Sequence, residues 1–147
     1  VALGAGDTAR AVHYFEEDIR LSRKAGDTSV SLPLGGLARA HALGGQPERA
    51  REIMARHFIP YIDRAEVYLT LGEPDAAREW ALRAYEDGWC EGPPYIWWWP
   101  LERAKAVLDA LGVPHPLLPP FDESSVGHYP YQDEVEAIIR RERNARR

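Results

Sequence analysis

Residues 60–86 read PYIDRAEVYLTLGEPDAAREWALRAYE, in which one helical pattern precedes a short turn and a second follows it. Pro60 and Pro74 stand where helices begin, because the first turn of a helix does not need the N–H group that proline lacks. Gly72 follows the first pattern, at the position where many helices end. The stretch therefore predicts an antiparallel helix pair joined at Leu71-Gly72.

The Leu-Gly pair of this turn recurs along the chain. It stands at Leu3-Gly4, Leu43-Gly44, Leu71-Gly72 and Leu111-Gly112, with spacings of 40, 28 and 40 residues. A polar turn and an alanine-bearing helical pattern follow three of the four pairs. Periods of this length indicate small helical units that stack, because one unit cannot bury its own apolar face alone. The chain starts inside such a unit, so we expect it to be part of a longer protein.

The spacing of apolar residues predicts an all-α fold without a β-sheet. We expect helices over residues 7–24, 32–43, 47–57, 61–71, 74–87, 101–111 and 132–146. Alanines at recurring positions would let antiparallel helices approach closely. Gly35 and Gly36 lie inside the second helix, where each glycine costs about 1 kcal/mol relative to alanine. Two adjacent glycines there indicate that a neighbouring element approaches closely.

These units resemble the tetratricopeptide repeat, a helix-turn-helix unit of about 34 residues. The third unit carries the matching residues Tyr61, Ala65, Tyr68, Ala77 and Ala84, and the second carries Leu34, Leu37, Ala38, His41, Ala50 and Met54. Arg64 and Ala81 stand where the family has a leucine and a large aromatic residue. The resemblance covers residues 1–112 as about three units, the first and last incomplete, and implies an α-solenoid of antiparallel helix pairs.

The resemblance also implies a function, namely a protein-interaction or scaffold module that binds a peptide or protein segment on a concave surface. First helices line this surface in the family. Their outward positions in this chain are Leu32, Gly35, Arg39, Ile62, Glu66 and Thr70. The asparagine, lysine and arginine clamp with which some members hold a C-terminal carboxylate is missing. We therefore expect Arg39, Ile62, Glu66 and Thr70 to contact a different kind of protein or peptide partner.

Residues 89–100 read WCEGPPYIWWWP and do not fit the repeat. Pro100 biases Trp99 away from helical conformation, so we expect a helix to begin at Pro100 or Leu101 and the tryptophans before it to be extended. Trp97, Trp98 and Trp99 either cover the end of the stack or form a binding surface, since tryptophan often dominates interfaces. A small-molecule pocket is the third interpretation.

The composition changes after Gly112. Residues 113–131 are rich in proline and aromatic residues, which predicts an extended strap packed along the helices. Residues 132–147 follow as a C-terminal amphipathic helix, whose apolar face has Tyr131, Val135, Ile138 and Ile139. We expect this helix either to cap the open end of the stack or to fold back into the groove, where it would compete with a partner.

The composition of the whole chain limits the functions to consider. Cys90 is the single cysteine among 147 residues, so no internal disulfide and no multi-cysteine metal site can form. A reducing, cytoplasmic compartment is therefore expected. No apolar run reaches the ~18 residues of a membrane span, and the net charge of -5 gives no support to nucleic-acid binding. We expect neither a membrane nor a nucleic-acid partner.

No catalytic or metal-binding constellation is predicted. His13 shares a helix face with Glu16 and Glu17, but no third ligand is evident, and solvated helix surface is the simpler interpretation. Cys90 has no nucleophile motif around it, and no glycine-rich phosphate-binding motif occurs. We expect no enzymatic activity, no metal and no cofactor.

A different class of function stays open as the alternative. The chain would then be a ligand-sensing regulatory domain, like the helical-repeat sensor halves of some bacterial regulators. A small molecule would be held between Tyr61, Tyr68 and the cluster of Trp97 to Trp99. A deep pocket with buried polar groups would favour this alternative, whereas an open apolar groove would favour the interaction module.

Overall fold

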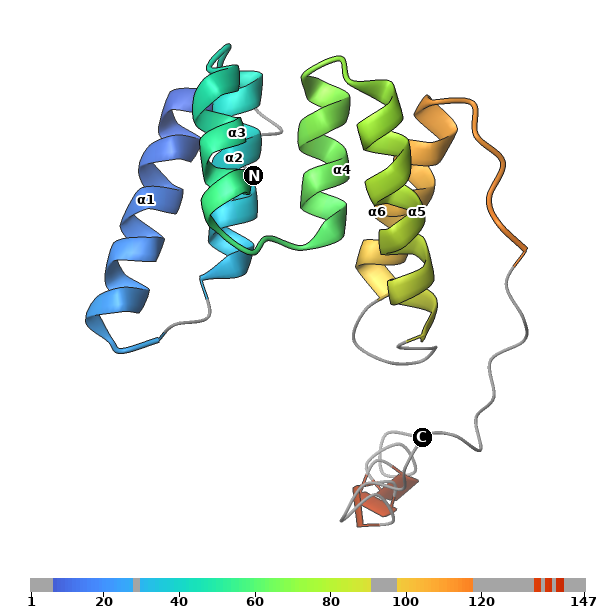
Figure 1. Ribbon diagram of the computed structural model, residues 1–147. Helices are drawn as coiled ribbons and strands as arrows, with labels where there is room; N and C mark the ends of the chain where they lie inside the picture. Colours follow the sequence, from blue (N-terminus) through green and yellow to red (C-terminus); the bar gives the residue numbers. More distant parts are fainter. Residues whose placement is uncertain are drawn as a thin grey trace.

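The computed structural model describes residues 7–27, 30–90 and 98–117, together with positions 134, 135, 137, 138, 140 and 141. The helices within these ranges are α1 (Thr8–Lys24), α2 (Ser31–Leu43), α3 (Pro47–Arg56), α4 (Tyr61–Thr70), α5 (Pro74–Cys90) and α6 (Trp98–Ala110). The described residues contain no β-strand (Figure 1). The prediction of an all-α fold is confirmed.

Glycines in left-handed conformation end several of these helices. Gly72 has a φ of 73°, and its N–H donates to the carbonyl of Leu69 at 3.1 Å, while the Glu73 N–H donates to the carbonyl of Tyr68 at 2.9 Å. The turn satisfies carbonyls that the helix itself leaves without a partner. After α2, Gly44 caps the helix end as predicted, and the next residue, Gly45, has the left-handed conformation. The predicted pair Leu3-Gly4 lies outside the described residues.

Among the described helices, four pairs of consecutive helices pack as antiparallel neighbours, and only α3 and α4 of the helices that follow one another do not form such a pair (Figure 1). α2 packs against α1 and α3, and α5 packs against α4 and α6. α2 also contacts α4, and α4 contacts α6, so the first helices of three successive units form one row. The protein is thus an α-solenoid of helix pairs.

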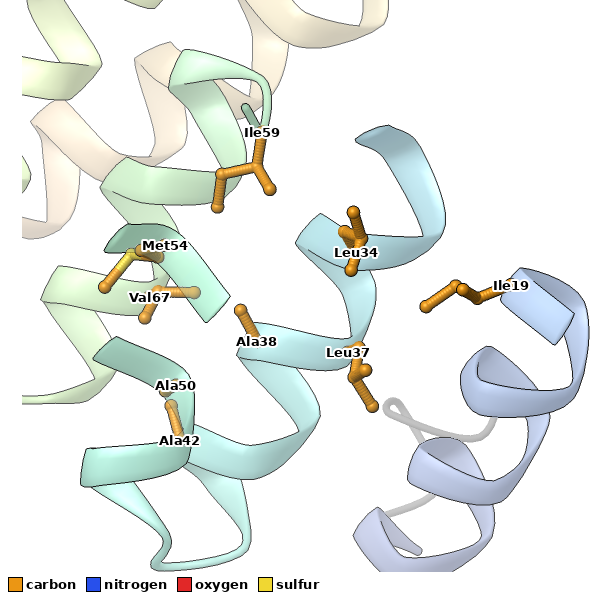
Figure 2. Packing of buried hydrophobic residues seen from close by; sticks show 9 residues of the cluster. All are labelled: Ile19, Leu34, Leu37, Ala38, Ala42, Ala50, Met54, Ile59 and Val67. Carbon is orange, nitrogen blue, oxygen red and sulfur yellow. The ribbon is translucent and has the colours of Figure 1, made fainter. Parts of the chain in front are cut away.

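Two apolar clusters fill the stack, and α4 contributes to both. The first joins side chains from α1 to α4, among them Val67 (Figure 2). The second lies among α4, α5 and α6 and includes Ile62 and Leu108, which are 2% and 0% exposed. The alanines at the helix contacts are fully buried, namely Ala38, Ala50, Ala65, Ala77, Ala81 and Ala104. Small side chains therefore sit where the helices approach one another, as the sequence predicted.

Gly35 and Gly36 occupy the two close approaches of α2. A Cβ atom added at Gly35 would lie 2.7 Å from Cγ and 2.8 Å from Cβ of Asp63 on α4. A Cβ atom at Gly36 would overlap the ring of Phe15 on α1. The prediction that a neighbouring element approaches this glycine pair is confirmed on both sides of α2.

Two helix boundaries differ from the prediction. α5 continues through Gly88 to Cys90, so Gly88 does not end a helix; its missing side chain instead admits α6, where Leu101 Cβ would lie 3.3 Å from an added Cβ. α6 begins at Trp98, so the prediction that Trp98 and Trp99 are extended is wrong. Pro100 stands in the first turn of α6, where its missing N–H has no intrahelical acceptor to lose.

The segment after α6 contacts the stack near its start, whereas Leu117 at the end of its described part is fully exposed. Val113 contacts the second apolar cluster, and Nε2 of His115 lies 2.8 Å from a carboxylate oxygen of Asp109. Residues 118–131 of the predicted strap lie outside the described residues. The described positions from 134 to 141 are helical, but Val135 and Ile138 are 52% and 56% exposed. The expected burial of these two side chains is therefore not found. For the segment to dock, the free energy gained by burying them would have to outweigh the conformational entropy lost by ordering the chain before them.

Candidate interaction surface

Four charged side chains join the row formed by α2, α4 and α6. Arg103 of α6 donates from Nε and Nη2 to the two carboxylate oxygens of Glu66 at 2.8 and 2.7 Å. The same Nη2 donates to Oδ1 of Asp63 at 2.6 Å. Arg39 of α2 places Nη1 2.7 Å from Oε2 of Glu66. Two arginines and two carboxylates thus balance in charge, and we call these four residues the ion network.

Asp63 is the most buried member of the ion network, with 6% of its surface exposed. Burial raises the pKa of its carboxyl above the ordinary value; Arg103 opposes the rise, and Glu66 adds to it. Burial also disfavours the charged guanidinium of Arg103, but hydrogen bonds and attraction from Glu66 and Asp63 outweigh it and raise the pKa of Arg103. Arg103 therefore stays charged and holds both carboxylates.

The ion network also positions an aromatic ring. The guanidinium carbon of Arg103 lies 4.9 Å from the ring centre of Trp99, one turn earlier on α6. A cation over an indole face is attracted by the electron density of the ring. Trp99 is 39% exposed, so a side chain fixed by Arg103 presents apolar surface to solvent.

Trp99 belongs to a pocket of about 440 Å³ that lies across one end of the helices. At this end α2, α4 and α6 begin and α5 finishes (Figure 1). Three large apolar side chains in its lining are exposed, namely Leu32 at 49%, Phe58 at 71% and Trp99 at 39%. Polar groups come from Ser31, Tyr61 and Asp87. Most of the exposed surface of the pocket lining is nevertheless apolar. Within the described residues no buried polar side-chain atom lacks a hydrogen bond.

The structure separates the predicted binding residues on the repeats. Arg39 and Glu66 are joined to each other in the ion network. Ile62 lines the pocket, yet it is only 2% exposed because it packs in the second cluster. Thr70 is exposed at the far end of α4 from the pocket, and its hydroxyl donates to the carbonyl of Glu66 at 2.8 Å.

The predicted aromatic residues are also divided. Trp98 is the first residue of α6, Trp99 lines the pocket, and Trp97 lies outside the described residues. Tyr61 lines the pocket with Trp99, whereas Tyr68 packs against the first apolar cluster. A small molecule in this pocket would therefore meet Tyr61 and Trp99 but not Tyr68.

Two residues important to this surface were not among the predicted sites. Phe58 lies in the connection between α3 and α4, and an aromatic residue in such a connection could have indicated a binding surface. Arg103 gave no local signal, because its partners Glu66 and Asp63 lie 37 and 40 residues earlier in the chain.

No group of three or more histidine, cysteine, aspartate or glutamate side chains that could hold a metal ion occurs in the described part of the chain. No helix there is both long enough and apolar enough to cross a bilayer.

Two adjacent segments, residues 32–56 and 60–83, match the family model of the tetratricopeptide repeat. The first covers the pair α2 and α3, and the second covers α4 and the part of α5 up to residue 83. The chain is a tetratricopeptide-like repeat protein. Comparison with curated proteins and with solved structures gave no match. Tetratricopeptide repeats generally mediate protein–protein interaction or scaffolding and are typically not catalytic.

Arg64, which departs from the tetratricopeptide pattern, has a structural role of its own. Its Nη2 donates to the carbonyls of Met54 and His57, at 2.9 and 3.2 Å, where α3 ends. The guanidinium also lies 5.0 Å from the ring centre of Trp80 on α5. In this tetratricopeptide-like unit an arginine of α4 thus contacts both α3 and α5, at a position where the family pattern has leucine.

Proposed function

We propose that this protein is an interaction module that binds an apolar peptide or protein segment in the pocket where α2, α4 and α6 begin. The observation that supports the proposal is the exposure of Phe58, Leu32 and Trp99 around one cavity. Covering apolar surface with a partner is favourable by roughly 25 cal/mol per Å². Apolar side chains gathered in one exposed patch are typical of interaction sites.

The ion network favours an apolar anchor over an acidic one. Arg39 and Arg103 already bind Glu66 at hydrogen-bonding distance, so an acidic partner would have to displace that carboxylate. The pocket next to the ion network needs no such exchange. We therefore propose that the partner places apolar side chains in the pocket and that the ion network holds the pocket wall in place through Trp99.

A second candidate function has one specific observation in its favour. The pocket volume of about 440 Å³ lies within the range of roughly 300–1,000 Å³ that is common for small-molecule sites. Tyr61 and Trp99 would then contact a ligand in a sensing domain.

The proposed function is tested by selecting, from a displayed peptide library, peptides that bind the full chain. The affinity of a selected peptide would be measured by fluorescence polarisation against wild type, Phe58→Ser and Leu32→Ser. We expect each variant to weaken binding tenfold or more, as truncation of central apolar anchors often does. Leu43→Ser is the matched control, because Leu43 is 44% exposed at the other end of α2.

Peptide affinities that Phe58→Ser, Leu32→Ser and Trp99→Ala all leave unchanged would refute the proposed site. Failure of the peptide selection, combined with thermal stabilisation of wild type but not of Phe58→Ser by a small molecule, would favour the second candidate function.

A further inference from the structure

We infer that the C-terminal segment of this same chain around Val135 and Ile138, whose described positions between 134 and 141 are helical, docks in the pocket and competes with an external partner for it. The inference rests on the proposed function, because it assigns a built-in occupant to the proposed binding site. The segment and the pocket are linked by three observations, which concern apolar surface, chain length and charge.

The first observation is that both surfaces expose apolar side chains. Val135 and Ile138 are three residues apart, which places them on one face of a helix. They are 52% and 56% exposed, while Phe58 and Leu32 in the pocket are 71% and 49% exposed. Contact between the two surfaces would remove both from water.

The second observation is that the chain is long enough for the segment to reach the pocket. The chain leaves α6 at the end opposite Trp99, so the segment must return along a helix of 13 residues, or about 20 Å. Residues 118–133 separate Leu117 from the segment, and sixteen residues can span up to about 50 Å. A short tether also gives the segment an effective concentration in the millimolar range.

The third observation is that the charges of the segment match those around the pocket. Glu134 precedes Val135, and Arg141 lies one turn after Ile138 on the same side of the helix. The first turns of α2 and α4 form one part of the pocket and favour negative charge, because helix N-termini carry partial positive charge. Asp87 lines the pocket near the end of α5. The segment would therefore lie with Glu134 toward α2 and α4 and with Arg141 toward Asp87.

Docking of this kind multiplies the apparent association constant of an external partner by the fraction of molecules that remain open. If nine-tenths of the molecules are closed, a variant that cannot close binds the partner about tenfold more tightly. Ile138→Asp is such a variant. Ala137→Asp is its matched control, since it adds the same charge to the same helix about 130° away from the Val135 and Ile138 face.

Paramagnetic broadening in the full chain detects the docked state directly. A spin label is attached at Ala137→Cys in a Cys90→Ser background, and NMR signals of Leu32 methyls and the Trp99 indole N–H are recorded. We expect both to broaden, whereas the methyls of Leu43 at the other end of α2 stay sharp. Ile138→Asp in the same labelled chain should restore the sharp signals.

Each outcome of these measurements decides the inference. Absence of selective broadening overturns it. Broadening that appears only between spin-labelled and isotope-labelled chains in a mixture also overturns it, because the occupant of the pocket would then be a second copy of the chain. If Phe58→Ser abolishes peptide binding but Ile138→Asp changes neither affinity nor broadening, the proposed function stands and this inference alone fails. If selective broadening occurs but no peptide is selected, the docking stands and the proposed function fails.

Discussion

At Gly35 the packing of α2 on α4 leaves room for a hydrogen atom but not for a methyl group. In an open helix position a change from glycine to alanine gains about 1 kcal/mol. Here the new methyl group would meet Asp63, whose carboxylate Arg103 holds in place. We expect Gly35→Ala to lower the free energy of unfolding by about 1–3 kcal/mol, measured by urea denaturation. Gly88→Ala, with its nearest contact at 3.3 Å, should cost less; the reverse order would contradict this packing.

The raised pKa of Asp63 predicts a pH-dependent stability. The unfolded carboxyl has a pKa of about 3.9, and burial raises the folded pKa above it. The folded state therefore keeps this proton to higher pH than the unfolded state. The resulting contribution of Asp63 to stability is fully present below about pH 3.9 and is lost as the pH rises through the folded pKa.

Asp63→Asn isolates this contribution because the amide does not titrate. We expect the free energy of unfolding of the variant, minus that of wild type, to increase as the pH rises from 3 and then to level off. Urea denaturation between pH 3 and 7 would measure the difference. Carboxyls outside the ion network, such as Glu17, whose pKa is lowered by its hydrogen bond to Arg20, titrate in both proteins and cancel. A difference that stays flat or falls would show that the Asp63 pKa is not raised.

At the scale of elements, Arg103 is the main polar link between α4 and α6. Arg103→Ala would leave Asp63 without its cation and Glu66 with Arg39 alone, so we expect a loss of about 3 kcal/mol in the free energy of unfolding. Arg39→Ala should cost less than about 1 kcal/mol, because the Arg39 side chain is 38% exposed and Glu66 keeps both bonds to Arg103.

Thermal and urea denaturation of these two variants test this asymmetry. Arg103→Lys is a useful third variant, since lysine keeps the charge but cannot bind a carboxylate through two parallel hydrogen bonds. Its stability should fall between those of wild type and Arg103→Ala. Equal losses for Arg39→Ala and Arg103→Ala would contradict the central position of Arg103.

At the scale of the whole molecule, α4 couples the two apolar clusters. Tetratricopeptide-like stacks are stabilised by contacts between neighbouring units, so a loss of stability in one unit also destabilises the next. Val67→Ala removes buried surface from the first cluster and should cost about 1–3 kcal/mol. All five tryptophans lie between Trp80 and Trp99, beyond the first cluster in the chain.

The positions of the tryptophans make the coupling measurable. Tryptophan fluorescence follows the second half of the chain, whereas far-ultraviolet circular dichroism follows every helix. We expect Val67→Ala to lower the unfolding midpoint equally by both signals, as in a single cooperative transition. A shift in circular dichroism with an unchanged fluorescence midpoint would show that the two clusters unfold independently.

Some features of the fold depend only on local sequence. Pro47 and Pro74 begin helices and Gly72 ends one, because a helix end depends on residues within a single turn. The same local rules failed at Gly88 and Pro100. Gly88 lies inside α5, where its missing side chain leaves room for α6, and the first turn of α6 tolerates Pro100.

The sequence by itself determined the helical class, the tetratricopeptide-like pairing and the need for small residues where helices meet, since periodicity and residue size carry this information along the chain. The tertiary structure decided which side chains form a surface. Glu66 and Arg39, predicted for a partner, are paired through contacts between α2, α4 and α6. Phe58 and Trp99 share a pocket although 40 residues separate them. Such groupings depend on how helices cross in space, and residue spacing along one helix does not record that.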